Sequence, residues 1–372
     1  MHRLPPFKIP AACGTAAILD RTGRRSNVEA LVRGMSVMFE RGNGLGAGFA
    51  AYGIYPGHAD CYALHLMAMS VAARERAGEY LRTVCQVVDE EAIPTRPTPT
   101  IADAPVLWRY FVRVPESKLD AENGQSEEDY VVALVMYINQ QVEGAYVASS
   151  GKNMGVFKGV GYPEPIAEFY RLDEYQGHLW ISHTRFPTNT GGWWGGAHPF
   201  GLLEWSIVHN GELSSYGVNK RYVEQFGYAC TLFTDSEVIN YMFDLLARKH
   251  RLGLEMACLV MAAPEWEDID REPEAKRRER LTTLRAAYAG ALLNGPFAVL
   301  VGFAGGVLGF CDRLKLRPLT AAEKGDRVYL ASEESAIWAM DGPPDRSWPI
   351  DAGKPVVFRL EEEKVAALAH TG

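Results

Sequence analysis

Cys13-Gly14-Thr15-Ala16-Ala17-Ile18-Leu19 is a short apolar stretch that ends at the turn sequence Asp20-Arg21-Thr22-Gly23. This pattern predicts a strand followed by a turn, with a cysteine at its start. A thiol is the most nucleophilic ordinary side chain, but it needs a base that removes its proton. The α-amino group of Cys13 could be that base, since its pKa of about 8 suits proton transfer at neutral pH. The sequence therefore predicts that residues 1–12 are a propeptide, which cleavage after the small pair Ala11-Ala12 would remove.

A buried cysteine without chemistry is the ordinary alternative for Cys13, because cysteine often serves as a small hydrophobic residue. Three polar motifs further along the chain favour the nucleophile. They are His183-Thr184-Arg185-Phe186, His209-Asn210-Gly211-Glu212 and Thr234-Asp235-Ser236-Glu237. With the thiol they would supply a guanidinium, two donors for an oxyanion and a carboxylate.

Arg185 and Asp235 could together hold an α-amino acid. Arg185 ends a stretch that begins in apolar residues, and its planar guanidinium matches a carboxylate through two hydrogen bonds. Asp235 begins an expected helix and could pair with the ammonium group of the same ligand. The ordinary alternatives are a surface salt bridge for Arg185 and a helix N-terminal acid for Asp235.

Asn210-Gly211 follows an apolar strand and could stabilise an oxyanion through the Asn side-chain amide and the Gly backbone N–H. A hairpin turn is the alternative, because Asn-Gly is also a common turn pair. His183, His198 and His209 match no zinc-binding spacing, so we expect hydrogen-bonded structural roles, and we expect no metal or cofactor. The loop Gly191–Gly196, with two tryptophans between glycine pairs, is either a lid over the site or a static loop.

Strands grouped towards both ends of the chain, with helices between them, predict a layered α+β sandwich. The expected domain covers residues 13–360, followed by a tail at 361–372. Within it, residues 58–143 look like an inserted small α+β subdomain, with expected helices at 69–88 and 127–141 and a strand at 106–114.

Bulk properties exclude several classes of protein. The formal net charge of −8 argues against a nucleic-acid or anionic-membrane surface. Six scattered cysteines without a Cys-x-x-Cys pair are typical of reduced thiols in the cytoplasm. Residues 286–311 carry no charge, but Gly295-Pro296 and Gly305-Gly306 divide them, which predicts two buried strands in place of a membrane span.

Taken together, these residues resemble the class II glutamine amidotransferase domain, which belongs to the N-terminal-nucleophile hydrolases. The resemblance extends from Cys13 to about Leu360 apart from the insertion. Its matching stretches are Cys13-Gly14, Arg41-Gly42, His183-Thr184-Arg185-Phe186-x-Thr188-Asn189-Thr190, Ala197-His198-Pro199-Phe200, Val208-His209-Asn210-Gly211-Glu212, Thr234-Asp235-Ser236-Glu237, Gly295-Pro296-Phe297-Ala298, Asp312-Arg313-x-x-x-Arg317-Pro318-Leu319 and Ala331-Ser332-Glu333.

The resemblance implies a four-layer αββα sandwich with two antiparallel sheets. It implies that Cys13 is the nucleophile and that Asn210 and Gly211 are the oxyanion donors. The glutamine carboxylate would be held at Arg185 and its ammonium at Asp235. Thr188 and His198 would line the pocket.

The implied activity is hydrolysis of the glutamine side-chain amide through a γ-glutamyl thioester on Cys13, which supplies ammonia to a partner. The chain is most similar to the free-standing amidotransferase subunits of split glutamate synthases and N-methylglutamate synthases, whose separate flavin-containing subunits use the ammonia or amine. We therefore expect a hetero-oligomer. Two alternatives are an N-terminal-nucleophile amidase for another amide and a catalytically silent regulatory or scaffold subunit.

Overall fold

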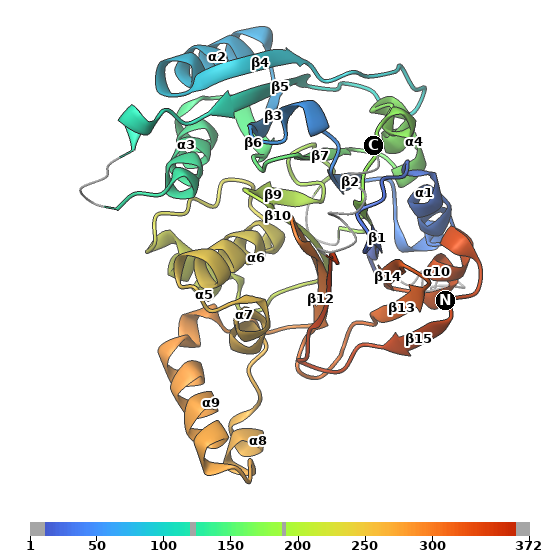
Figure 1. Ribbon diagram of the computed structural model, residues 1–372, viewed down its shortest axis with the longest axis vertical. Coiled ribbons are helices and arrows are strands. Elements are labelled where there is room, and N and C mark those ends of the chain that lie inside the picture. Colours follow the sequence, from blue (N-terminus) through green and yellow to red (C-terminus); the bar gives the residue numbers. More distant parts are fainter. Residues whose placement is uncertain (1–11, 120–123, 188–190, 362–372) are drawn as a thin grey trace, which may run out of the picture.

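A seven-stranded antiparallel sheet forms the centre of the fold in the computed structural model, which describes residues 12–119, 124–187 and 191–361 (Figure 1). Its order is β15-β13-β14-β1-β8-β2-β7. The strands are β15 (Arg346–Pro349), β13 (Thr320–Lys324), β14 (Arg327–Ala331), β1 (Gly14–Asp20), β8 (Leu179–Thr184), β2 (Ala47–Tyr52) and β7 (Met154–Gly159). The strand expected from Cys13 to Leu19 is thus confirmed and lies near the middle of this sheet.

A second antiparallel sheet packs against the first, in the order β16-β12-β11-β10-β9. It consists of β16 (Val356–Arg359), β12 (Gly306–Cys311), β11 (Phe297–Phe303), β10 (Trp205–Gly211) and β9 (Phe200–Leu202). β11 and β12 are the two strands expected in the uncharged stretch 286–311. None of the helices within the described ranges combines the length and apolarity that crossing a bilayer requires.

Alternating side chains place the two sheets between layers of helices. In β1, Ala17 and Leu19 pack between the sheets, whereas Ala16 and Ile18 face the helices on the other side. These helices are α1 (Glu29–Ser36), α4 (Pro163–Phe169) and α10 (Glu334–Asp341). The outer face of the second sheet is covered by α5 (Tyr216–Glu224), α6 (Asp235–Phe243) and α7 (Leu254–Met261). The predicted four-layer αββα sandwich is therefore confirmed.

A third sheet, β4-β5-β3-β6, occupies the region expected as an insertion (Figure 1). Its elements are β3 (Tyr62–Ala68), α2 (Val71–Val84), β4 (Gln86–Ala92), β5 (Val106–Arg113), α3 (Glu127–Gln141) and β6 (Ala145–Ser149). Both expected helices and the strand at 106–114 are present, with small shifts at their ends. β6 lies beyond residue 143 and pairs with β3, so the sheet extends past the expected end of the insertion.

Two helical segments have features that the sequence does not indicate. The helix expected from Asp235 onwards is α-helical to Phe243 and continues as a π-helical turn, Asp244–Lys249. In the charged segment after residue 264, α8 (Trp266–Asp270) and α9 (Ala275–Ala287) project from the body (Figure 1). α9 buries a single side chain, Leu281, which is why it does not belong to any of the core layers.

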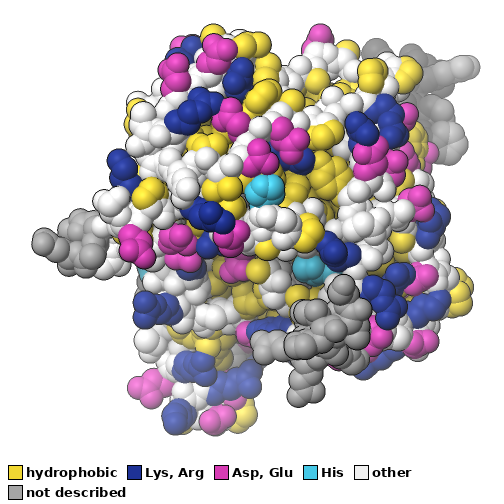
Figure 2. All heavy atoms as spheres, turned by 45° about the horizontal axis from the view of Figure 1, so that its top comes forward, with side chains coloured by type: hydrophobic (Ala, Val, Ile, Leu, Met, Phe, Trp, Pro, Cys, Tyr) yellow, Lys and Arg dark blue, Asp and Glu magenta, His cyan; other side chains and the backbone are white. Residues whose placement is uncertain are grey.

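The surface carries both signs of charge. Figure 2 shows acidic and basic side chains intermixed over one face, with hydrophobic side chains between them. The face shown therefore has no broad basic area that would attract nucleic-acid phosphates. The formal net charge of −8 agrees with this.

Buried histidines make the stability of this fold dependent on pH. Burial is the main cause that lowers the pKa of His65 and His183 to about 3 and that of His178 to about 4. Between these values and about 6.5, the unfolded chain binds protons that the folded chain does not. We therefore expect these histidines to lower the free energy of unfolding as the pH decreases below 6.5, by up to about 1.4 kcal/mol per pH unit for each of them.

Urea denaturation at pH 7 and pH 5 measures this effect. His178→Gln should weaken this dependence, since it removes one of the groups that cause it. Equal unfolding free energies of the parent protein at the two pH values would contradict the prediction.

Candidate active site

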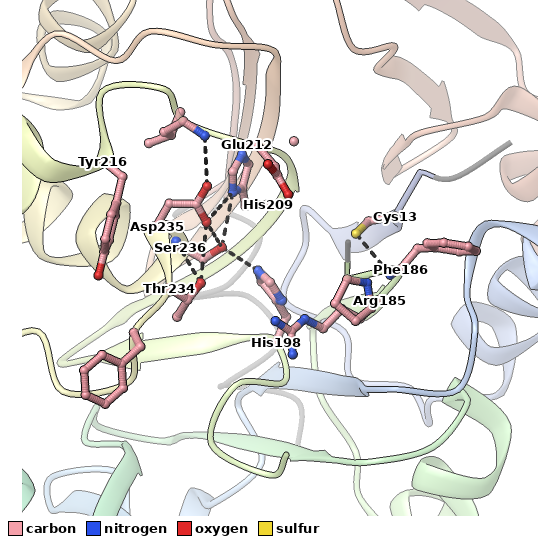
Figure 3. Close-up of a pocket in the computed structure, with 14 residues that line it drawn as sticks. Cys13, Arg185, Phe186, His198, His209, Glu212, Tyr216, Thr234, Asp235 and Ser236 are labelled. Atoms are coloured by element: carbon pink, nitrogen blue, oxygen red, sulfur yellow. Dashed lines mark hydrogen bonds and ion pairs between the residues drawn. The ribbon is translucent and has the colours of Figure 1, made fainter. Parts of the chain in front are cut away.

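A cavity of about 310 Å³ lies where four elements end, and Cys13, Arg185, Gly211 and Asp235 line it together (Figure 3). The strand register explains half of this arrangement. Gly14 of β1 pairs with Thr184 of β8, so that Cys13 lies beside Arg185 where these two central strands of the first sheet end. The end of β10 and the first residue of α6 complete the opposite wall.

Cys13 is partly exposed, and its Sγ accepts a hydrogen bond of 3.4 Å from the Phe186 N–H. Burial raises the pKa of the thiol above its ordinary value, although this N–H and the charges of Arg185 and Arg317 act in the opposite direction. The thiol is therefore mostly protonated at neutral pH. A base is needed before it can attack a carbonyl carbon.

Arg41 holds the backbone of Cys13, a role that sequence reasoning did not assign. Its Nε donates to the Cys13 carbonyl at 3.1 Å, and its Nη1 pairs with Glu333 at 2.7 Å. The next residue, Gly42, approaches β8 so closely that a Cβ there would lie 2.1 Å from Thr184 Oγ1. The backbone at Gly42 therefore lies in close contact with β8, beside the cysteine.

Asp235 is the first residue of α6, where the helix dipole favours a negative charge. Its carboxylate accepts hydrogen bonds from Leu213 N at 3.0 Å and Ser236 Oγ at 3.3 Å. Burial acts to raise the pKa of Asp235, but the neighbouring His209 and the Leu213 N–H outweigh it and hold the pKa below its ordinary range. Asp235 is thus a carboxylate at neutral pH.

Arg185 faces Asp235 across the cavity. Figure 3 shows Cys13, Arg185 and Phe186 on one side and Asp235, Ser236 and His209 on the other, with His198 between the two groups. Burial lowers the pKa of Arg185, while the charges of Cys13 and Asp235 oppose this shift. A cation and an anion on opposite walls suit a ligand that carries both charges.

The three histidines form a buried hydrogen-bonded group, as predicted. Ser236 Oγ lies 2.7 Å from His198 Nε2 and 3.2 Å from His209 Nδ1, while His183 Nε2 lies 3.1 Å from the carbonyl oxygen of His209. The rings of His183 and His198 stack with their centroids 3.9 Å apart. Among the described residues, no cluster of His, Cys, Asp and Glu has the arrangement of a metal site.

Asn210 is buried, and its side-chain nitrogen and oxygen both lack a hydrogen-bond partner within the described ranges. Buried amides are normally hydrogen-bonded, so both groups of Asn210 are available to a ligand in the cavity that it lines. Asn210 lines an adjoining cavity of about 460 Å³, and Cys13 and Gly211 line both this cavity and the first. Gly211 has φ +154°, and a Cβ there would lie 2.0 Å from Pro296 O, so only glycine fits.

The structure brings together six of the seven site residues expected from the sequence, namely Cys13, Arg185, His198, Asn210, Gly211 and Asp235. Thr188 lies outside the described residues. Sequence reasoning did not assign Tyr216, Phe233 and Ser236, which also line the first cavity, or Arg317, which lines the second. Arg317 does belong to the motif Asp312-Arg313-x-x-x-Arg317-Pro318-Leu319, which could have indicated it.

The loop Gly191–Gly196 packs partly into the body of the protein. Trp194 is 9% exposed and contacts Phe169, whereas Trp193 is 39% exposed. The packing of Trp194 is the arrangement expected of a static loop. Closure of this loop over the site stays a prediction.

Comparisons with known proteins identify the family. The model of class II glutamine amidotransferases matches residues 101–366, a range that begins after Cys13. An uncharacterized protein of Archaeoglobus fulgidus is 50% identical over 362 residues, which cover 96% of this chain and 95% of that protein. The ferredoxin-dependent glutamate synthase 2 of Synechocystis sp. is 24% identical over 79% of this chain and 20% of its own length.

Among solved structures, the glutamine phosphoribosylpyrophosphate amidotransferase of B. subtilis is 15% identical, with a TM-score of 0.44. The match covers 94% of this chain and 49% of that one, so the chain spans about half the length of that solved protein. The family model covers more than half of the chain, and the A. fulgidus relative covers nearly all of it at 50% identity. The chain therefore belongs to the class II glutamine amidotransferases.

Proposed function

We propose that this protein hydrolyses the side-chain amide of glutamine through a thioester on Cys13. One observation carries the proposal: a thiol, a guanidinium and a carboxylate line one cavity of about 310 Å³. Arg185 would bind the α-carboxylate and Asp235 the α-ammonium. The side-chain amide of the same molecule would then reach Cys13.

The first half of the reaction forms the thioester. After removal of residues 1–12, the α-amino group of Cys13 takes the proton of its own thiol. The thiolate attacks the amide carbon, and the Asn210 side-chain N–H and the Gly211 N–H stabilise the resulting oxyanion. Each such donor typically contributes about 3–4 kcal/mol to transition-state stabilisation. The α-ammonium then returns the proton to the leaving nitrogen, so that ammonia departs and the γ-glutamyl thioester remains.

The second half hydrolyses the thioester. The α-amino group takes a proton from water, the hydroxide attacks the thioester carbon, and the C–S bond breaks. Glutamate leaves, and the proton returns to the thiolate of Cys13. The raised pKa of the Cys13 thiol supports this assignment, because a protonated thiol needs such a base.

We further propose that a partner subunit uses the ammonia in a glutamate synthase-like reaction, with the flavin on that partner. The similarity to one fifth of the Synechocystis glutamate synthase supports this assignment. All six cysteines are free thiols, which supports a reducing compartment such as the cytoplasm.

Arg185→Ala tests the recognition of the α-carboxylate. We expect the KM for glutamine to rise by about 10- to 100-fold, because hydrogen bonds to a charged group are lost. Glutaminamide has an amide in place of the α-carboxylate. The parent protein should hydrolyse it more slowly than glutamine, and Arg185→Ala should hydrolyse it as fast as the parent does. Steady-state release of glutamate and ammonia measures both effects.

Arg359→Ala is the matched control. Arg359 is an exposed arginine on β16, and it pairs with Glu255 at 3.1 Å. It should leave both substrates unaffected. An unchanged KM for glutamine in Arg185→Ala would show that the site does not recognise an α-carboxylate there. Hydrolysis of other amides but not of glutamine would reject the proposed substrate.

A further inference from the structure

Two charged side chains are buried behind the cavity and take no part in the proposed chemistry. Lys158 belongs to β7 of the first sheet and Glu237 to α6, and each is 1% exposed. A buried charge is costly unless other groups compensate it. The hydrogen bonds of the two side chains identify the segments that they hold in place.

Lys158 is bound to the glycine-rich loop. Its Nζ donates a hydrogen bond of 3.0 Å to the carbonyl oxygen of Gly195 and lies 4.2 Å from the centroid of the Phe200 ring. Burial lowers the pKa of Lys158 to about 7, while the charge of Glu237 acts to raise it. The lysine thus depends on the glutamate to remain charged.

Glu237 is bound to the segment that precedes α6. Its carboxylate accepts hydrogen bonds from Thr231 N at 3.0 Å, Leu232 N at 2.9 Å and the Tyr241 hydroxyl at 3.0 Å. Burial raises the pKa of Glu237 to about 7, against these hydrogen bonds and the charge of Lys158. The dependence between the two charges is therefore mutual.

Lys158, Glu237 and Asn240 all line one small cavity of about 10 Å³. Asn240 is on the same face of α6 as Glu237, and its Oδ1 has no hydrogen-bond partner in the described part of the chain. A cavity of this size accommodates about one water molecule, and these groups offer it several polar partners.

Both segments held by this pair continue into the wall of the substrate cavity. His198 follows three residues after Gly195, while Phe233, Thr234 and Asp235 come directly after Leu232. The two segments meet at the hydrogen bond of 2.7 Å between His198 and Ser236. The pair therefore supports two cavity walls from behind, without touching the cavity itself.

We infer that Lys158 and Glu237 form a charge pair, bridged by one water molecule, that positions these two walls for glutamine binding. The inference rests on the proposed function, because it concerns the same cavity. Neither residue is catalytic. Removal of one charge leaves the other buried without compensation and displaces the segment that it holds, whereas removal of both leaves no uncompensated charge.

Glutamine binding in a Cys13→Ala background tests this pair without turnover. Lys158→Met and Glu237→Gln should each weaken binding by about 10-fold or more, since small displacements at a site are costly. The double variant should bind more tightly than either single variant. In proteins that retain Cys13, the single variants should raise KM far more than they lower kcat.

Arg248→Met is the matched control. Arg248 pairs with the buried Asp244 at 2.6 Å in the π-helical turn that continues α6, at the end away from Asp235. It should lower the thermal transition temperature but leave glutamine affinity unchanged. Lys158→Arg, which keeps the charge, should bind more tightly than Lys158→Met.

The outcomes separate this inference from the proposed function. No glutamine binding by the Cys13→Ala parent would reject the proposed function. Normal binding by that parent and by its folded Lys158→Met variant would overturn the inference. If Lys158→Met does not fold, Glu237→Gln and the double variant decide the matter, because a double variant that binds no better than Glu237→Gln alone would overturn the pairing.

Discussion

Cys13→Ala is expected to abolish glutamine hydrolysis while the protein keeps its fold and its affinity for glutamine. Without a thiol no thioester can form, so we expect kcat to fall by on the order of 10⁴-fold or more. The fold should survive because Cys13 directly precedes β1, is partly exposed, and does not belong to the strand pairs of the central sheet. Glutamate release, the thermal transition and calorimetric binding of glutamine measure the three properties separately.

Cys85→Ala is a suitable control for this experiment. Cys85 follows α2 near the third sheet, and burial raises its pKa to about 11, so it is an unreactive thiol. This variant should hydrolyse glutamine at the parent rate. A glutamine-like diazoketone should alkylate Cys13 in the parent protein and no residue in Cys13→Ala. Undiminished glutamate release by Cys13→Ala would reject Cys13 as the nucleophile.

The residues of the candidate site could be located because they belong to short motifs of particular residue types. Cys13, Arg185 and Asp235 each lie at the end of a strand or at the start of a helix, and hydrophobic patterns indicate such ends well. Their mutual distances could not be predicted. Cys13 lies beside Arg185 only because β1 and β8 pair with Gly14 opposite Thr184, and this register joins segments about 170 residues apart.

The third sheet shows where local patterns fail. β4 (Gln86–Ala92) contains three acidic residues and is mostly exposed at the edge of its sheet, so it lacks the alternation that predicts a half-buried strand. The sequence instead indicates a helix that continues to residue 88. β6 lies beyond the expected end of the insertion at residue 143, but it pairs with β3, from which α2 and α3 separate it in the sequence.

Lys158 was not recognised because a single lysine in the short strand Met154–Gly159 gives no sign of its burial. Burial of such a charge is a property of the assembled layers. It depends on the loop at Gly195 and on Glu237 in α6, both of which are distant in sequence. Short sequence motifs pointed to the residues that line the cavity, whereas the burial of Lys158 and Glu237 became visible only in the structure.

Retention of residues before Cys13 is expected to lower glutamine hydrolysis by about 10²- to 10⁴-fold, the usual contribution of a general base. While Ala12 is attached, the nitrogen of Cys13 is an amide and cannot accept a proton. Burial raises the pKa of the thiol, so the fraction of thiolate at neutral pH is small. The neighbouring imidazoles of His183 and His198 offer no substitute, because burial lowers the pKa of both, that of His183 to about 3, and makes them weak bases.

Two chains that differ by one alanine test this requirement. One begins at Cys13 and the other at Ala12, each released from a fusion protein and checked by intact mass. The chain that begins at Cys13 should be active, and its rate should depend on a group with a pKa of about 8 or lower, the α-amino group. The chain that begins at Ala12 still has the thiol, Arg185, Asn210 and Asp235. If it hydrolyses glutamine as fast as the other chain, the α-amino group is not the base, although Cys13 could still be the nucleophile.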